Sequence, residues 1–185
     1  MHSFPERKQS DYIRIYHDVI SEEDCEKAIS MIESADHDML VSERKRSKKR
    51  FWVYYIEDST FEMQMNMMFE NVYHMYRHDM YATVLPPHPN FGHVKIKRYD
   101  KGSDDRFLPH VDVTGAINNQ RYLAMLLYLN DVDEGGETVF ECLDEPIKPE
   151  RGKCVVFPPL WLYKHQALPA ISHSKYSIQT YARYK

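Results

Sequence analysis

The amino-acid sequence predicts an α+β fold, in which N-terminal helices brace a double-stranded β-helix (jelly-roll) core. Two helical patterns lie within the first 81 residues, and short strand-like runs separated by turn signals follow from Pro86 onward. Helices followed by a run of strands indicate that the helices cover one face of a double-sheet structure. Because no repeat, low-complexity tract or linker interrupts the chain, we expect one domain over residues 1–185.

The first expected elements are a strand and a helix. Residues 12–16, with the sequence YIRIY, alternate in the manner of a half-buried strand. Ser21 is a favourable helix N-cap, and the three acidic residues after it suit the positive end of a helix dipole. The stripe that this helix is expected to bury consists of Cys25, Ala28, Ile29, Ile32 and Ala35.

A second helix is predicted from about Ser59 to Tyr81, and strands fill the chain beyond it. Apolar residues recur at helical spacing there, and the methionines among them are expected to pack in the core. These apolar residues are Phe61, Met65, Met68, Phe69, Val72, Tyr76 and Met80. The predicted strands cover residues 94–98, 107–112, 122–130, 137–141, 154–157, 160–165 and 175–184.

The composition excludes several classes of protein. The 24 basic and 28 acidic residues give a net charge of -4, which provides no overall attraction to nucleic acid or to membranes. No stretch approaches the roughly 20 apolar residues of a membrane span, and the first ten residues lack the apolar part of a secretory signal. We therefore expect a cytoplasmic protein without a membrane partner. The cysteines, Cys25, Cys142 and Cys154, are odd in number and lack C-x-x-C spacing, so they are expected to be core thiols.

One short motif has the spacing of a metal site. His110 and Asp112 are two residues apart, and side chains at this spacing on a strand project from the same face. With one further histidine from another strand, they would form the facial triad of non-haem iron(II), which leaves three coordination positions open. An H-x-D pair alone is weak evidence, because a chain with ten histidines and many acids contains such pairs by chance.

Further motifs surround this pair in a definite order along the chain. They are R-Y-x-x-G at residues 98–102, P-H-V-D at 109–112, Y-L-N at 128–130, G-G-E-T-x-F at 135–140, and then His165, Pro169 and Lys175. In this order the motifs resemble the catalytic domain of prolyl 4-hydroxylases and related iron(II)/2-oxoglutarate oxygenases. The resemblance covers nearly the whole chain, and G-G-E-T-x-F is its most specific part.

The resemblance implies a ligand set and a co-substrate site. Iron(II) would be held by His110, Asp112 and His165, and 2-oxoglutarate would fill two of the three open positions, leaving one for O2. The distal carboxylate of 2-oxoglutarate would be buried, where a charge is tolerated only if it is paired. By the resemblance Lys175 supplies that pair and Tyr128 a nearby hydroxyl, with Tyr99 and Thr138 as second contacts. Ascorbate is a further cofactor that the family suggests.

Each of these residues also has a purely structural interpretation. His165 alone would more often be a satisfied core or surface histidine than a ligand. Tyr99 and Tyr128 could be core residues with hydrogen-bonded hydroxyl groups, and Gly135-Gly136 could be a turn between two strands. Only the ordered pattern of motifs separates the functional interpretation from these.

The substrate side is less well defined by the sequence. Six of the seven residues from 44 to 50 are basic, which is typical of a solvated loop, but resembling enzymes have a mobile lid over the substrate here. Arg46 in this run and Trp161 are therefore candidate substrate contacts, and the aromatic residues 51–55 are either docking surface or core strand. Tyr181, a third candidate, stands where the family often has tryptophan. His173, Ala170 and Glu141 also depart from the family pattern, which weakens any inference about the substrate.

Three functions follow, and they differ in testable ways. The first is hydroxylation of prolyl residues in a peptide or protein, coupled to oxidative decarboxylation of 2-oxoglutarate to succinate. The second is the same chemistry on another residue or on a free amino acid. The third is a non-catalytic module that holds a structural metal and binds an acidic partner, or nucleic acid, through the basic run. A structural metal site needs neither Lys175 nor open coordination positions, so the sequence favours catalysis. It makes no prediction of oligomeric state.

Overall fold

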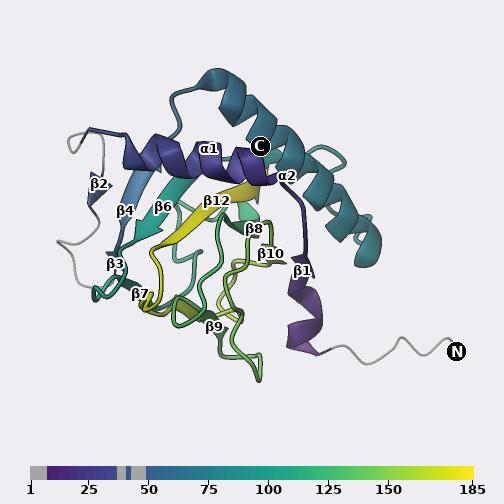
Figure 1. The fold of residues 1–185 in the computed structure, drawn as a ribbon. Helices are drawn as coiled ribbons and strands as arrows, with labels where there is room; N and C mark the ends of the chain where they lie inside the picture. Colours follow the sequence, from purple (N-terminus) through teal and green to yellow (C-terminus); the bar gives the residue numbers. More distant parts are fainter. Residues whose placement is uncertain (1–7, 37–40, 43–48) are drawn as a thin grey trace, which may run out of the picture.

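The computed structural model describes residues 8–36, 41–42 and 49–185, in which two antiparallel sheets are covered on one side by two helices (Figure 1). A short 3-10 helix, η1 (Gln9–Tyr12), precedes the first strand. The larger sheet has the order β1-β10-β8-β12-β6-β4-β2, with β5 also paired to β12, and the smaller has the order β3-β7-β11-β9. The strands of the larger sheet are β1 (Arg14–Tyr16), β2 (Val41–Ser42), β4 (Trp52–Tyr55), β5 (Asn90–Phe91), β6 (Lys95–Tyr99), β8 (Arg121–Tyr128), β10 (Cys154–Phe157) and β12 (Lys175–Arg183). Those of the smaller sheet are β3 (Lys49–Arg50), β7 (Arg106–His110), β9 (Thr138–Phe140) and β11 (His165–Ala167).

The two helices begin where the sequence supplies caps. In α1 (Glu22–Glu33) the Ser21 hydroxyl accepts a hydrogen bond from the Asp24 amide at 3.1 Å. In α2 (Ser59–Asp79) the Asp58 carboxylate accepts from the amides of Thr60 and Phe61 at 2.9 and 3.0 Å. Such caps satisfy amide groups that have no partner within the helix. Both helices lie across the same face of the larger sheet (Figure 1).

Strand alternation divides the larger sheet into a helix-facing side and a side that faces the smaller sheet. In β8, Leu123, Met125 and Leu127 pack with the helices, whereas Ala124 and Tyr128 belong to a second cluster with residues of the smaller sheet. This division follows from the two-residue period of a strand. The architecture is the predicted double-stranded β-helix braced by helices. Its helix-facing core consists of Cys25, Ala28, Ile32, Phe61, Met65, Phe69, Val72, Ile96, Leu123, Met125, Leu127, Cys154, Val156 and Ile178, among others.

Most predicted elements are present, but several boundaries differ. Ser34 caps the first helix, so Ala35 lies outside it, and the second helix ends at Asp79. The predicted strand at residues 160–165 is wrong, because residues 160–164 form a turn closed by a hydrogen bond from the Tyr163 amide to the Leu160 carbonyl, with Leu160 to Leu162 exposed and Tyr163 buried. The strand there is β11, which begins only at His165.

The aromatic segment after the basic run is largely strand. Phe51 lies just before β4 and Val53 lies within it, and both are buried, as the core interpretation predicts. Tyr55, at the end of β4, is exposed. Of the basic run, only residues 49–50 are within the described part of the chain, as strand β3, and Arg46 lies outside it. The cysteine prediction is confirmed for Cys25 and Cys154, which are fully buried free thiols.

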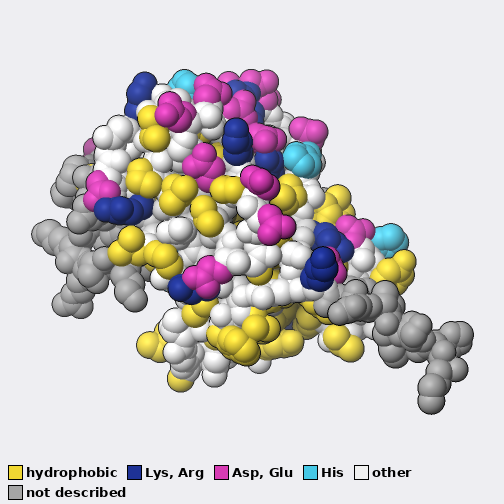
Figure 2. Space-filling view, turned by 90° about the horizontal axis from the view of Figure 1, so that it is seen from below, with side chains coloured by type: hydrophobic (Ala, Val, Ile, Leu, Met, Phe, Trp, Pro, Cys, Tyr) yellow, Lys and Arg dark blue, Asp and Glu magenta, His cyan; other side chains and the backbone are white. Residues whose placement is uncertain are grey.

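The surface is mixed in character. Viewed from below, hydrophobic side chains gather towards one margin, whereas charged side chains predominate towards the opposite margin (Figure 2).

Among the helices of the described residues, none combines the length and the apolar character that crossing a bilayer requires.

Two consecutive glycines connect the sheets by joining β8 to β9. Gly135 and Gly136 both have positive φ, of 77° and 75°, a conformation that strongly favours glycine. The Gly136 amide donates to the Pro169 carbonyl at 2.8 Å, which ties this loop to the loop between β11 and β12. A Cβ atom added at Gly135 would collide with the same Pro169 carbonyl oxygen.

We therefore expect Gly135→Ala to lower the free energy of unfolding by about 1–3 kcal/mol, because alanine adds both backbone strain and a clash. The measurement is urea denaturation followed by circular dichroism. Gly115→Ala is the matched control, because no atom lies within 4 Å of the position of its added Cβ. A Gly135 variant as stable as the Gly115 variant would contradict this account of the loop.

Candidate metal centre and adjoining cavities

The predicted metal ligands come together at one end of the smaller sheet. His110 is the last residue of β7 and pairs in register with His165, the first residue of β11. The Asp112 carboxylate lies beside both rings, with Oδ1 at 3.6 Å from His110 Nε2 and Oδ2 at 3.9 Å from His165 Nε2. The candidate ligand atoms of the three residues all lie within 4.8 Å of one another. One metal ion could therefore contact all three side chains.

Hydrogen bonds orient both rings for this purpose. His110 Nδ1 lies 2.8 Å from the Leu108 carbonyl oxygen, and His165 Nδ1 lies 3.0 Å from that of Tyr163. A ring that donates from Nδ1 to a carbonyl keeps an unprotonated Nε2 as a metal ligand. His110 Nε2 and Asp112 Oδ2 are buried without a hydrogen-bond partner among the described residues. Buried polar atoms are seldom left in this state, so the donor set fits a metal.

The electrostatic environment favours the ligand forms of these groups. Burial lowers the pKa of His165 to about 4, against the opposing effect of Asp112. Burial alone would raise the pKa of Asp112. The neighbouring His110 and then the charge of His165 outweigh this effect and lower the pKa to about 2. At neutral pH the cluster therefore contains a carboxylate and a neutral imidazole, which are the protonation states that bind a metal.

Asp112 reaches the cluster from a turn and not, as predicted, from the same strand as His110. Strand β7 ends at His110, and Asp112 follows two residues later. The Asn118 side chain holds this turn, since its Nδ2 donates to the Asp112 carbonyl at 2.7 Å and its Oδ1 accepts from the amides of Thr114 and Gly115. Arg121 Nη1 donates to the same Asp112 carbonyl at 3.3 Å. Four short-range contacts thus fix the position of the carboxylate.

A small inner cavity of about 20 Å³ adjoins the cluster in the space between the sheets. His110, His165, Tyr99, Thr138 and Lys175 are among its lining residues. Lys175 is 1% exposed, and its ammonium donates to the Gly136 carbonyl at 2.6 Å. The ammonium lies 5.0 and 5.2 Å from the ring centroids of Tyr99 and Tyr128, and the Tyr128 hydroxyl donates to Thr138 Oγ1 at 2.7 Å. All four residues predicted for co-substrate binding are therefore neighbours.

Lys175 is a buried cation whose charge is only partly offset. Burial lowers the pKa of Lys175 to about 7, with Glu137 acting in the opposite direction. A buried ammonium is costly unless an anion accompanies it. Ser177 lies two residues further along β12 in the same cavity, and its buried hydroxyl has no hydrogen-bond partner among the described residues. The inner cavity thus offers a cation and a hydroxyl group to an anionic ligand.

An outer cavity of about 560 Å³ opens on the other side of the cluster. His110 and Asp112 form part of its wall, and Tyr181 lies there with Arg121 stacked on its ring at 4.0 Å from the centroid. Burial and then the Asp112 carboxylate raise the pKa of the Tyr181 hydroxyl well above its usual value. The size is that of a site for a small ligand or a few residues of a peptide.

The substrate candidates are distributed unequally. Tyr181 lines the outer cavity, whereas Trp161 is 75% exposed on the turn after β10 and lines neither cavity, so its role stays a prediction. Sequence reasoning did not single out several polar residues that line these cavities or hold Asp112. They are Lys95, Lys97, Asn118, Arg121, Lys164, Ser177 and Gln179.

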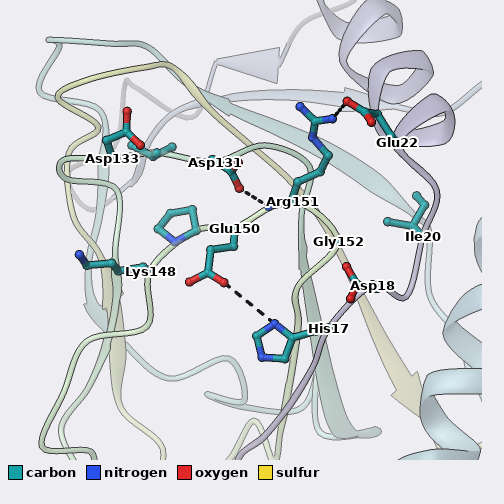
Figure 3. Close-up of a pocket in the computed structure, with 12 residues that line it drawn as sticks. His17, Asp18, Ile20, Glu22, Asp131, Asp133, Lys148, Glu150, Arg151 and Gly152 are labelled. Carbon is teal, nitrogen blue, oxygen red and sulfur yellow. Dashed lines mark hydrogen bonds and ion pairs between the residues drawn. The ribbon is translucent and has the colours of Figure 1, made fainter.

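A larger cavity than these two lies elsewhere among the described residues and has a different character. It measures about 830 Å³ and is formed by the turn between β1 and α1 together with the loops before β9 and β10 (Figure 3). Its charged side chains face one another: Arg151 pairs with Glu22, and His17 lies 4.0 Å from Glu150 (Figure 3). Among the described residues, the group with ligand atoms arranged for a metal is the one at His110, Asp112 and His165.

Comparisons with known proteins agree with this geometry. Residues 94–183 match the sequence model of the 2OG-Fe(II) oxygenase superfamily. A comparison with curated proteins gave no match. The fold is similar to that of a viral collagen prolyl hydroxylase from Paramecium Bursaria Chlorella virus-1 in a 2OG complex, with a TM-score of 0.73, 18% identity, and 94% and 97% of the two chains covered.

Two further solved structures have comparable similarity. For a Pseudomonas putida prolyl-4-hydroxylase the TM-score is 0.74 at 16% identity, with 94% of this chain and 93% of that chain covered. For a Trichoplax adhaerens prolyl hydroxylase, in complex with a peptide fragment of the hypoxia inducible factor oxygen degradation domain, the TM-score is 0.72 at 14% identity, with 94% and 84% covered. At these identities the similarity shows a common fold.

Replacing His110, Asp112 or His165 by alanine should weaken Fe(II) binding by at least about a hundredfold, because each change removes one of three protein ligands. The bound metal can be measured by elemental analysis after anaerobic dialysis, with circular dichroism to confirm the fold. His74→Ala, an exposed position on α2, is the control and should bind metal normally. Any variant of the three that retained one tightly bound equivalent would remove that residue from the ligand set.

Stability should depend on pH through Lys175. Its pKa is about 7 in the folded protein and about 10.5 in the unfolded chain, so the unfolded chain binds more protons between these values and stability rises with pH there. Between pH 7 and 9, the free energy of unfolding should rise by about 2 kcal/mol relative to that of Lys175→Met. Urea denaturation of both proteins at several pH values is the measurement. A constant difference across this range would mean that Lys175 stays charged in the fold.

Proposed function

We infer that this chain, whose residues 94–183 match the model of the 2OG-Fe(II) oxygenase superfamily, hydroxylates prolyl residues in a peptide or protein. As a 2-oxoglutarate-dependent dioxygenase it uses Fe(2+) and 2-oxoglutarate, for which the His110, Asp112 and His165 cluster has a suitable donor set. One observation carries the proposal: residues of this cluster line two adjoining cavities, one that also contains the buried Lys175 and one lined by aromatic residues.

His110, Asp112 and His165 would hold the metal and would leave further coordination positions to small molecules. When bound, Fe(II) would bring 2-oxoglutarate and O2 together and couple decarboxylation of the oxo acid to oxidation of a substrate C–H bond. The protein's task is to hold the cluster in a fixed geometry. The backbone carbonyls of Leu108 and Tyr163 orient the two imidazoles, while Asn118 and Arg121 hold the turn of Asp112.

In this proposal the inner cavity is the 2-oxoglutarate site. Its geometry supports the assignment, because an acid with carboxylates at both ends can place one at the metal and the other against Lys175. That carboxylate would replace the missing partner of the buried ammonium. Ser177 and the Tyr128–Thr138 pair supply hydroxyl groups near the same end. Burial and neighbouring charges raise the pKa values of Tyr99 and Tyr128, so both remain neutral donors at pH 7.

The outer cavity is assigned to the residue that is oxidised. Phe51, Tyr55, Phe107 and Tyr181 contribute aromatic surface to it, which suits the flat apolar ring of proline. Phe107 also stacks on His110, with ring centroids 3.3 Å apart, so an apolar wall extends to the cluster. The prolyl hydroxylases among the similar structures support this choice of substrate. The proposal treats residues 1–185 as one catalytic domain, and ascorbate as cofactor stays a prediction.

The experiment is to incubate the protein with Fe(II), 2-oxoglutarate and a panel of proline-containing peptides, and to search for a mass gain of one oxygen. We expect hydroxyproline together with an equimolar amount of succinate, and neither product with His165→Ala. Succinate without modification of any peptide would keep the enzyme class and reject the prolyl substrate. Oxidation of a different residue, or of a free amino acid, would support the alternative substrate class.

A further inference from the structure

The outer cavity has an uneven distribution of charge. Four cationic side chains line it, those of Lys95, Lys97, Arg121 and Lys164, whereas Asp112 is the one carboxylate among its described lining residues. Asp112 is one of the three candidate metal ligands, so a bound metal ion would neutralise its charge. The chain as a whole is acidic, with a net charge of -4, and the cavity therefore differs in sign from the rest of the molecule. A positive cavity with low-dielectric walls favours an anionic ligand.

Two of these cations have other tasks. Lys164 pairs with Glu141 at 2.5 Å, and both side chains are partly exposed. Arg121 stacks on Tyr181 and donates to the Asp112 carbonyl, and so it supports the metal turn. Lys95 and Lys97 lie on β6, away from the turn of Asp112, although the charge of Lys97 helps to lower the pKa of Asp112.

Lys95 and Lys97 form a row that leads towards the cluster. They are two residues apart on β6 and so share one face, followed by Tyr99 in the inner cavity. Opposite them on β12 are Gln179, which is in register with Lys95, and Ser177, which is in register with Lys97. Lys97 lines both cavities and is 6% exposed, while Lys95 is half-buried nearer the opening.

The surroundings of Lys97 hold its ammonium at the junction of the two cavities. Its Nζ donates to Gln179 Oε1 and lies 5.1 and 5.9 Å from the ring centroids of Phe51 and Phe107. Aromatic faces stabilise a cation without neutralising its charge. Lys95 similarly lies over the Tyr55 ring at 5.7 Å from its centroid. Each positive charge thus borders the apolar wall that would contact the target residue.

We propose that the outer cavity selects substrates that carry a carboxylate close to the residue to be oxidised, and that Lys95 and Lys97 determine this preference. The inference rests on the proposed function, in which the outer cavity receives the substrate. A carboxylate of an aspartate or glutamate one or two residues from the target would meet this row while the target ring packs on the aromatic wall. An acidic peptide suits the site better than nucleic acid, because the net charge of -4 gives the chain no overall attraction to an extended polyanion.

The test uses peptides that are identical except for one residue beside proline, which is glutamate, glutamine or lysine. Hydroxylation gives kcat/KM for each peptide, and fluorescence anisotropy with labelled peptides gives binding independently of turnover. For the wild-type protein we expect the glutamate peptide to exceed the glutamine peptide by about tenfold in both measurements. The preference should shrink in 0.5 M NaCl, because salt screens the attraction.

Variants assign the preference to β6. Lys97→Met should reduce the glutamate preference to about twofold or less, and Lys95→Glu should shift it towards the lysine peptide. Lys101→Met is the matched control, since Lys101 is exposed and lines neither cavity, and it should retain the wild-type preference. Because Lys97 is buried, its variant is first compared with wild type in thermal unfolding, and Lys95→Glu gives an independent answer at a more exposed position.

Several outcomes would overturn the proposal. Equal kcat/KM and equal binding for the glutamate and glutamine peptides would reject the preference while leaving prolyl hydroxylation intact. If Lys97→Met weakened 2-oxoglutarate binding but kept the peptide preference, the lysine would serve the co-substrate instead. Tighter binding of a single-stranded oligonucleotide, lost in the same variant, would assign the row to phosphate. Preferential binding of the glutamate peptide without hydroxylation would not overturn the proposal, because it would support the charge selectivity and reject only the prolyl target of the proposed function.

Discussion

The antiparallel pairing of β7 with β11 is the constraint on which the site depends. It places His110 directly opposite His165, so two ligands that are 55 residues apart in the sequence meet through backbone hydrogen bonds rather than through a flexible loop. The same strand β11 pairs with β9 on its other side, which brings Phe140 against His165. A shift of one residue in either pairing would turn His165 away from the cavity. The position of the metal cluster is therefore a property of sheet register.

The buried polar groups follow from the same arrangement. Helices cover the apolar face of the larger sheet, so its polar face is turned inward towards the smaller sheet. Lys175 occupies this inward face, where its charge is unfavourable unless an anion is bound. The cavity thus has an uncompensated positive charge at Lys175 and the candidate metal ligands His110 and His165 in the same lining. In the proposed function, a dianion would pair with Lys175 through one carboxylate and reach the metal through the other.

Much of the site could be predicted because its residues stand in an ordered set of motifs. His110, Asp112, His165 and Lys175 were found in this way, and the structure brings them to one pair of cavities. Lys97 and Gln179 could not be found, because polar residues that alternate with apolar ones look like the solvent side of a strand. Periodicity separates two faces but does not reveal that the polar one lines a cavity. The strand predicted at 160–165 failed for the converse reason, since its apolar residues Leu160, Trp161 and Leu162 are exposed on a turn.

Strand β12 has a consequence for how such a protein can change over evolution. Lys175, Ser177, Gln179 and Tyr181 alternate along it, from the closed end of the inner cavity to the wall of the outer one. At two residues per repeat these positions span about 20 Å, so in the proposed function separate parts of a single strand would contact the co-substrate and the substrate. Substitutions near Tyr181 can therefore alter what is accepted without disturbing Lys175. An insertion within the strand would instead turn every later side chain to the opposite face, so this segment should vary in composition far more readily than in length.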